Sequence, residues 1–235
     1  MTQSSPKPLP ITGLEADMLS REDRDYARTT QFPSPILDKP SAMDDQEKIE
    51  YIATRFQEIM EVLGLDLSDE SLAKTPTRVA KMYVHEIFSG LDRNTFPPLT
   101  FIKDKYSLEE AGNRVFMKVN FCSFCEHHFV PIKGIAYVAY LPNKKLIGLS
   151  KIPRIVRYFS KRPQVQERLT AQIADCLSFI LETEDVAVYI AAEHYCIVAR
   201  GIEDDDSHAI THVLKGRFLT DTHTRKEFFD AVNKS

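Results

Sequence analysis

Two short stretches of this chain carry side chains of the types that bind transition metals. The first reads Cys125-Glu126-His127-His128, and the second reads His194-Tyr195-Cys196. Zinc accepts thiolate sulfur and imidazole nitrogen in tetrahedral geometry, and a catalytic zinc has three protein ligands with the fourth position left for water. Two cysteines and one histidine from these stretches can supply such a site, which leaves further histidines free for other chemistry.

The spacing does not decide which histidine of the first stretch is a ligand. Cys125 can share a site with His127 on an extended chain, or with His128 across a turn. A different arrangement uses the CxxC formed by Cys122 and Cys125 and, with His128 and Cys196, closes a four-ligand structural zinc. That arrangement has no open coordination position, so the sequence leaves a catalytic and a structural site as alternatives.

A basic segment stands out in a chain whose net charge is −4. From Lys144 to Arg168 it has eight basic residues and one acid, Glu167, which suits a polyanionic ligand of modest size, with a solvated helix face as the alternative. Within it, Gly148-Leu149-Ser150-Lys151 predicts a strand end followed by a helix start. Free N–H groups, the serine hydroxyl and the lysine ammonium would there form a phosphate site, with Arg154 one turn further on.

The elements that must position these groups follow from hydrophobic periodicity. We expect helices at 44–63, at 75–90 with Thr75 as the N-cap and Pro76 at the first helical position, after Ser150, and after Pro163 to about Leu181. We expect strands at 115–121, 135–141, 186–192 and 196–202. The period of two along 186–192, if continued, places His194 and Cys196 on one face. Cys176 falls on an apolar helix stripe and is expected in the core. This order predicts an α+β fold with an antiparallel sheet that carries helices on one face.

Length and composition bound the rest. The chain has 235 residues, of which 43% are hydrophobic and 27% charged, so it can bury a sizeable core. We expect a proline-rich flexible arm at 1–42, a helical region at 43–110 and a catalytic domain at 111–235. Four cysteines are too few for a disulfide framework, and neither a secretion signal nor a membrane-spanning run is evident, so the cytoplasm is the expected location.

Together these motifs resemble the GTP cyclohydrolase I family. The resemblance extends from about Asp44 to the carboxyl terminus. It is carried by Cys125-Glu126-His127-His128, Ile147-Gly148-Leu149-Ser150-Lys151, Arg162-Pro163-Gln164-Val165-Gln166-Glu167-Arg168-Leu169, His194-Tyr195-Cys196 and Ala199-Arg200-Gly201, with Lys81-Met82-Tyr83 and Ile87-Phe88-Ser89-Gly90-Leu91 in addition. Several long motifs in the right order make chance agreement implausible.

The resemblance implies a tunnelling fold, with an antiparallel sheet, two helices packed on one face and helices preceding it. It implies a homodecamer of two face-to-face pentamers with active sites between subunits, and neither nucleic acid nor membrane as a partner. The family opens the purine ring of GTP at C8 and releases formate and 7,8-dihydroneopterin triphosphate, the entry into folate or tetrahydrobiopterin synthesis.

The resemblance also assigns roles to residues of this chain. Cys125, His128 and Cys196 match the zinc ligands, and His127 and His194 match the histidines that transfer protons. The positions that bind substrate are matched by Glu167 with Gln166 beside it, near the guanine, and by Ser150, Lys151, Arg154 and Arg200, near ribose and triphosphate.

Two departures from the family pattern keep alternatives open. The segment 203–212 contains Asp204-Asp205-Asp206 where the family usually has a run of serine and threonine, so either these carboxylates face solvent or the substrate preference differs. Cys122 stands where a hydroxyl residue is common, and on oxidation it could pair with Cys125. The alternatives are a non-catalytic zinc module that binds RNA, and an enzyme of the same fold that stops at a ring-opened formylamino intermediate or takes a modified purine.

Overall fold

The computed structural model describes residues 33–37, 41–103, 113–143 and 145–234. Most of the arm expected at 1–42 therefore lies outside the described residues. Helix α2 (Asp45–Val62) begins with a capping box, in which Asp44 accepts from the Glu47 N–H and the Glu47 side chain accepts from the Asp44 N–H. Together with the stop at Gly64, whose φ is +79°, this confirms the first expected helix.

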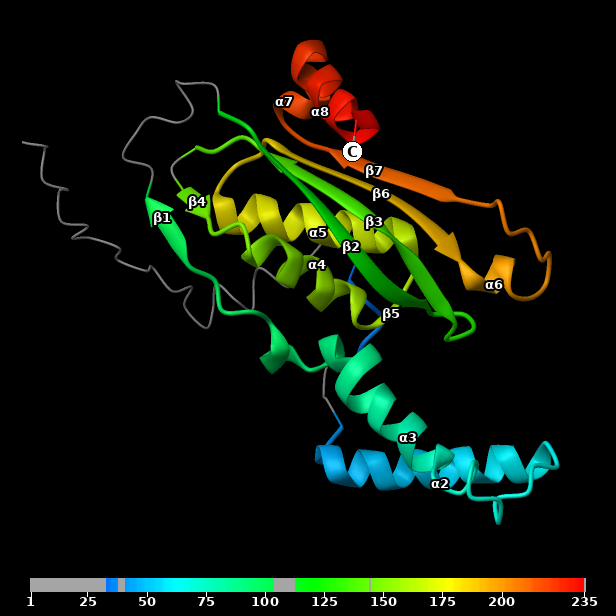
Figure 1. Cartoon of the computed structure of the whole chain (residues 1–235). Coiled ribbons are helices and arrows are strands. Elements are labelled where there is room, and N and C mark those ends of the chain that lie inside the picture. The colour runs from blue at the N-terminus through cyan, green and yellow to red at the C-terminus, as the bar shows by residue number, and fades with distance from the viewer. Residues whose placement is uncertain (1–32, 38–40, 104–112, 144, 235) are drawn as a thin grey trace, which may run out of the picture.

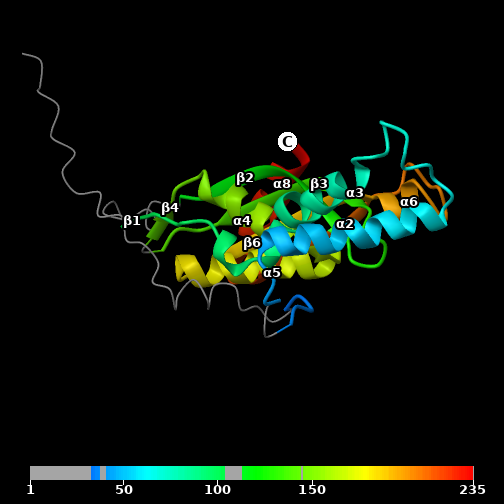
Figure 2. The same ribbon diagram turned by 90° about the horizontal axis from the view of Figure 1, so that it is seen from below.

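The second expected helix is present, but its two halves differ. Helix α3 (Thr75–Lys81) continues directly into a π-helix, η1 (Met82–Ile87), and two short 3₁₀ turns, η2 (Ser89–Leu91) and η3 (Arg93–Thr95), follow. The expectation of Thr75 as N-cap is wrong, since Thr75 is already helical and the N-cap is Lys74, which makes no side-chain cap bond. Figure 1 shows α2 and α3 apart from the sheet, and in the view from below in Figure 2 α2 lies in front of the sheet and its helices.

A five-stranded sheet forms the centre of the molecule (Figure 1). Its strand order is β5 (Pro163–Gln164), β2 (Val115–Cys125), β3 (Pro131–Tyr140), β6 (Val186–His194), β7 (Ala209–Leu214). The expected antiparallel arrangement holds for β2, β3, β6 and β7, whereas the two-residue strand β5 runs parallel to β2. A separate small sheet pairs β1 (Phe101–Lys103) with β4 (Lys145–Ile147).

The strand expected at 196–202 is wrong. The chain leaves the sheet after His194 and forms a short helix, α6 (Tyr195–Val198). The cause is the chain topology. Strand β7 pairs antiparallel with β6, and Ala209 at the start of β7 is the partner of Ala192 near the end of β6, so the chain must reverse its direction between these two residues. Gly201, with φ +75°, lies in this reversal, where a residue without a side chain is favoured.

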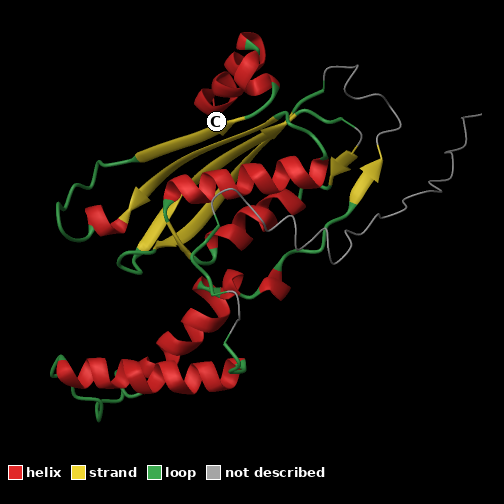
Figure 3. Ribbon diagram, turned by 180° about the vertical axis from the view of Figure 1, so that it is seen from behind, coloured by secondary structure: helices red, strands yellow, loops and turns green. Residues whose placement is uncertain are grey.

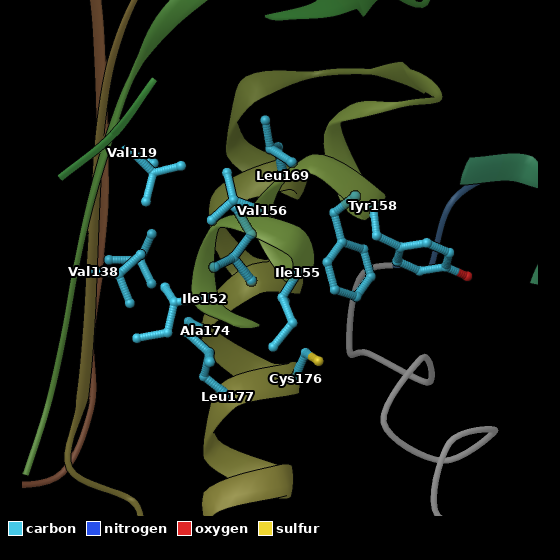
Figure 4. Close-up of a cluster of buried hydrophobic side chains, with 14 of the residues drawn as sticks. Val119, Val138, Ile152, Ile155, Val156, Tyr158, Leu169, Ala174, Cys176 and Leu177 are labelled. Atoms are coloured by element: carbon cyan, nitrogen blue, oxygen red, sulfur yellow. The ribbon is translucent and has the colours of Figure 1, made fainter. Parts of the chain in front are cut away.

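Helices α4 (Lys151–Ser160) and α5 (Gln166–Leu181) cover one face of the sheet, as expected (Figure 3). The core lies between them and the strands, and Figure 4 shows side chains of both helices directed towards Val119 and Val138 of β2 and β3. Each fully buried aliphatic side chain contributes about 1.5–3 kcal/mol. Cys176 is 1% exposed in this core, as expected, and burial raises the pKa of its thiol.

The opposite face of the sheet is also covered, which the sequence did not lead us to expect. Helices α7 (Arg217–Thr220) and α8 (Thr222–Lys234) place Phe218 and Phe228 against Ala139 and Ala187, which alternate with the residues that face α4 and α5. In the described part of the chain, no helix is both long and apolar enough to cross a membrane.

Candidate active site

The two stretches with Cys and His residues meet because the end of β2, the start of β3 and the end of β6 lie at the same end of the sheet. The hairpin between β2 and β3 runs from Cys125 to Val130 and is closed by the Cys125 N–H on the Val130 carbonyl at 2.8 Å. Within it Phe129 has φ +54°, a strained value for a side chain of this size, and its ring packs on Phe88 of the preceding region at 5.0 Å. The pairing of Ile132 with His194 then brings the end of β6 beside this hairpin.

Cys125, His128 and Cys196 form a three-donor group whose ligand atoms all lie within 4.8 Å of one another. The hairpin turn thus places His128 with the two sulfurs, although the Nδ1 atom of His127 also lies 3.7 Å from the Cys125 sulfur. Burial, with Cys125 as a second cause, raises the pKa of the Cys196 thiol. Two such thiols that repel each other as thiolates are a donor set that a divalent cation stabilises.

Cys122 does not belong to this group. Along β2, Phe121, Ser123 and Cys125 are buried, whereas Cys122 is exposed, as the period of two requires. Its sulfur therefore leaves the strand on the face away from Cys125. This geometry disfavours the four-ligand structural zinc and a Cys122–Cys125 disulfide.

His194 ends β6 next to the donor group and is held by Gln166. The His194 Nε2 atom lies 2.7 Å from the Gln166 carbonyl oxygen, Oε1. Burial lowers the pKa of His194, while the charge of Glu167 acts in the opposite direction. The expectation that His194 and Cys196 share a strand face is wrong, since Cys196 lies in α6 and reaches the donor group from a helical turn.

The first turn of α5 contacts the site through consecutive residues. Gln166 is buried and bonded to His194, Glu167 is exposed, and Arg168 forms an ion pair with Glu126 of the metal hairpin. The Arg168 Nη1 atom lies 2.5 Å from Glu126 Oε2, and Nη2 lies 3.4 Å from Oε1. This pair connects α5 to the residue that lies between Cys125 and the two histidines.

Ser150 and Lys151 lie near the other end of α5, whereas Arg154, one turn along α4, lines a pocket with Arg157 and Lys161. Lys145 bonds to Glu182, the C-cap of α5, and the strand of Lys145 leads within a few residues to Ser150. Because α5 has 16 residues at 1.5 Å each, its two ends are about 24 Å apart. Ser150 and Lys151 are therefore remote from Glu167 and the three-donor group of the same chain.

The expected cradle of free N–H groups at this helix start is only partly present. The Lys151 N–H bonds to the Gly148 carbonyl and the Ile152 N–H to the Leu149 carbonyl, so these two donors are used within the turn. The Ser150 hydroxyl makes no cap bond. Hydroxyl, ammonium and guanidinium groups, rather than backbone N–H groups, are thus what this segment presents.

Arg200 and the acidic segment follow α6. Arg200 is exposed, and its charge acts on Cys196, so it lies on the metal side of the molecule. Residues 203–206 are exposed, and the Asp206 N–H bonds to the Asp204 carboxylate at 3.2 Å. These carboxylates are thus exposed in the single chain, and the two possibilities left by the sequence both stay predictions.

Sequence reasoning missed two of the contacts that build this site. The Arg168–Glu126 pair spans 42 residues, and no spacing rule connects them. The cluster of Tyr83, Phe88 and Phe129 supports the metal hairpin from the helical region, with ring centroids 5.0 to 6.3 Å apart. The π-helix that contains Tyr83 points to this region in the structure, since such insertions are frequent at functional sites. The sequence alone provides no signal for it.

Comparisons with known proteins agree with this geometry. A family model described as GTP cyclohydrolase I matches residues 52–233. A protein of Aeromonas hydrophila named GTP cyclohydrolase 1 is 52% identical over 194 residues, which are 83% of this chain and 88% of that protein. Proteins of the same name from Pasteurella multocida (51% over 183 residues, 78% and 83% of the two chains) and Haemophilus influenzae (49% over 201 residues, 86% and 90%) are similar to nearly the same extent.

Proposed function

Because the chain belongs to the GTP cyclohydrolase I family, we propose that it converts GTP and water to formate and 7,8-dihydroneopterin triphosphate. The observation that carries this proposal is the Cys125–His128–Cys196 group beside His194, at the position where the strand ends meet. The α+β fold, with two helices on one face of a curled sheet, is consistent with the tunnelling fold of that family. Such a product is the starting point of a folate or biopterin pathway.

We propose that the metal is zinc. Two thiolates and one imidazole are a soft donor set that suits zinc, and three protein ligands leave one position open. When bound, zinc would supply a Lewis acid that activates water for attack at C8 of the purine. Four free cysteines, none in a disulfide, fit a reducing compartment, so we also propose that the enzyme works in the cytoplasm.

Two histidines near the site, His127 and His194, are not among the three proposed metal ligands and are therefore candidates for proton transfer. We propose that His194 donates a proton to the imidazole-ring nitrogen of the purine, and that His127 assists ring opening and loss of formate. His194 is partly buried and anchored, which holds its ring in one place, whereas the His127 side chain is 65% exposed and free to meet substrate.

Substrate recognition is proposed to use residues from more than one subunit. We propose that Glu167, which is exposed on the first turn of α5, accepts paired N–H donors of the guanine edge. The triphosphate would be bound by Arg200 from the metal side and by Ser150, Lys151 and Arg154 of a neighbouring subunit. The separation of about 24 Å along α5 supports this division for Ser150 and Lys151, which lie near the end of the helix that is remote from Glu167.

We therefore propose a homodecamer of two pentamers with active sites between subunits. In the described part of the chain, β7 and most of β2 have a neighbouring strand on one side only. These edges carry exposed apolar side chains, with Ile210 at 58% and Phe116 at 39%. Open edges of this kind pair with other strands, and pairing the edges of successive subunits closes a ring without leaving an edge.

The activity is tested by following formate release and pterin absorbance with GTP. We expect both signals with the zinc-loaded protein and neither after treatment with a chelator. Cys125→Ser should lose metal and activity, whereas Cys122→Ser is the matched control, a cysteine on the same strand that should keep both. Zinc retention without any turnover of GTP would contradict the proposed reaction, and metal loss in the control would revive the four-ligand site.

Inter-subunit sites are tested by mixing two inactive variants. Cys196→Ser removes a metal ligand, and Lys151→Met removes a phosphate contact at the other end of α5. If each site combines two subunits, dissociation and reassembly of a 1:1 mixture should restore about a quarter of the sites. Activity that stays at the level of the separate variants would show that each chain builds its whole site alone.

A further inference from the structure

The Gln166 side chain joins three elements of the fold. It belongs to the first turn of α5 and is 2% exposed. Its amide nitrogen, Nε2, donates to the Ala209 carbonyl of β7 at 2.9 Å and to the Ile190 carbonyl of β6 at 3.2 Å, and it lies 3.2 Å from the Thr211 hydroxyl. Its oxygen, Oε1, faces His194 Nε2 at 2.7 Å.

These contacts fix which end of the amide is which. Backbone carbonyl oxygens only accept hydrogen bonds, so the atom that faces Ala209 and Ile190 must be the NH₂ group. The oxygen is then the atom that faces His194. An exchange of the two ends would set Oε1 against two carbonyl oxygens in a buried place and leave all three oxygens without a donor there.

The same accounting fixes the histidine. An amide oxygen has no proton to give, so the His194 nitrogen at 2.7 Å must carry one. A neutral imidazole has a single N–H, which leaves Nδ1 as the unprotonated atom. Within the described residues Nδ1 has no hydrogen-bond partner.

From this we infer that Gln166 is a positioning residue that holds neutral His194 as its Nε2–H tautomer and so makes Nδ1 the nitrogen that exchanges a proton with the substrate. In the donation step, the Nδ1–H bond of the imidazolium breaks, an N–H bond forms on the purine ring, and the tautomer bonded to Gln166 remains. The catalytic part of this inference rests on the proposed function, whereas the tautomer does not.

Further bonds keep Gln166 in place. The Thr170 hydroxyl, one turn along α5, bonds to the Gln166 backbone carbonyl at 2.8 Å and lies 2.7 Å from the Thr211 hydroxyl. The amide is therefore fixed at its base and at its end. Because both of its polar atoms are already bonded, contact with substrate is left to the exposed Glu167, and the substrate-binding role expected for Gln166 becomes a role in positioning His194.

Nitrogen NMR of histidine-labelled, zinc-loaded protein tests the tautomer without any turnover. At mildly alkaline pH the wild-type His194 should show a protonated Nε2 and an unprotonated Nδ1, assigned by the signals lost in His194→Asn. Gln166→Met removes the acceptor at similar length and should give a mixture of tautomers. Gln172→Met is the matched control, a buried glutamine 1% exposed on the same helix, and should leave the His194 signals unchanged.

Kinetics separate positioning from a merely structural role. Gln166→Met should lower kcat about 10- to 100-fold, the range for removing a hydrogen-bond partner that orients a side chain of a metal site, with KM within about threefold of wild type. Thr211→Val removes a partner of the amide nitrogen but leaves Oε1 on His194, so it should keep the tautomer and most of kcat.

Three results would overturn the inference. They are a wild-type His194 that carries its proton on Nδ1, an unchanged tautomer in Gln166→Met, and a Gln166→Met variant in which KM rises while kcat is unchanged. If Gln166→Met fails to fold, the wild-type spectrum and Thr211→Val still decide the matter. An Nε2–H tautomer in a protein that does not turn over GTP would support the positioning role while contradicting the proposed function.

Discussion

The ion pair between Arg168 and Glu126 should stabilise both the fold and the metal hairpin. Arg168 is 17% exposed and Glu126 is 21% exposed, so the pair lies between the surface and buried cases. Exposed pairs contribute about 0–1 kcal/mol, and removal of one partner of a buried pair costs about 3–5 kcal/mol. Since only one of the two hydrogen bonds is short, we expect a coupling energy of about 2 kcal/mol.

A double-mutant cycle measures this coupling. The variants are Arg168→Met, Glu126→Gln and both together, and urea unfolding at one fixed protein concentration gives each free energy of unfolding. The exposed pair Lys226–Asp230 on α8, with side chains 74% and 46% exposed, is the matched control and should show at most about 0.5 kcal/mol.

The metal readout extends the same argument. Glu126 lies between Cys125 and the histidines, so loss of its anchor lets the hairpin relax. If about 1 kcal/mol of the coupling acts on the metal-bound geometry, the zinc affinity of Arg168→Met should fall about fivefold in competition with a chelating dye. A coupling no larger than that of the control pair, together with unchanged zinc affinity, would refute the reasoning.

Other predictions concern packing and helix ends. Gly90→Ala should lower stability by about 1–3 kcal/mol in urea unfolding, because a Cβ there would lie 2.8 Å from the Lys161 carbonyl that accepts the Gly90 N–H; an unchanged midpoint would be inconsistent with this contact. Phe228→Ala should cost about 3–5 kcal/mol, since the ring is 1% exposed beneath α8, and a loss under 1 kcal/mol would argue against that packing. Bonds from Thr224 lower the pKa of Asp221, so its ionised form stabilises the fold above the ordinary aspartate pKa near 4 and this contribution disappears as the pH falls through the lower folded value. Asp221→Asn should therefore be less stable than wild type at neutral pH and approach it in acid, as thermal melts across that range would show.

Local patterns predicted most elements of the fold. The helix from Asp44 and the apolar stripe through Cys176 are encoded within a few residues of sequence, and both appear as expected. The helices α7 and α8 escaped prediction because their apolar side chains are few and cover a second sheet face, which only the paired strands define.

The strand expected at 196–202 failed for a related reason. Cys196 and its neighbours have the residue types of a strand, but their conformation is set by the reversal from β6 to β7, which involves pairing of Ala192 with Ala209. Long-range pairing overrode local propensity there. For the same reason the sequence offered both His127 and His128 as ligands, and the tight hairpin that distinguishes them was not readable from spacing.

The first turn of α5 limits which residue can be substituted to change the ligand that this protein recognises. Successive helical residues point about 100° apart, so Gln166, Glu167 and Arg168 reach three different neighbours from one rigid turn. Gln166 is committed to His194 and Arg168 to Glu126, which leaves Glu167 as the position in this turn with an unshared side chain. With Glu167 as the proposed contact to the guanine, a designer who wants a different heterocycle in the site would vary that position alone, while an insertion or deletion in the turn would move all three side chains together.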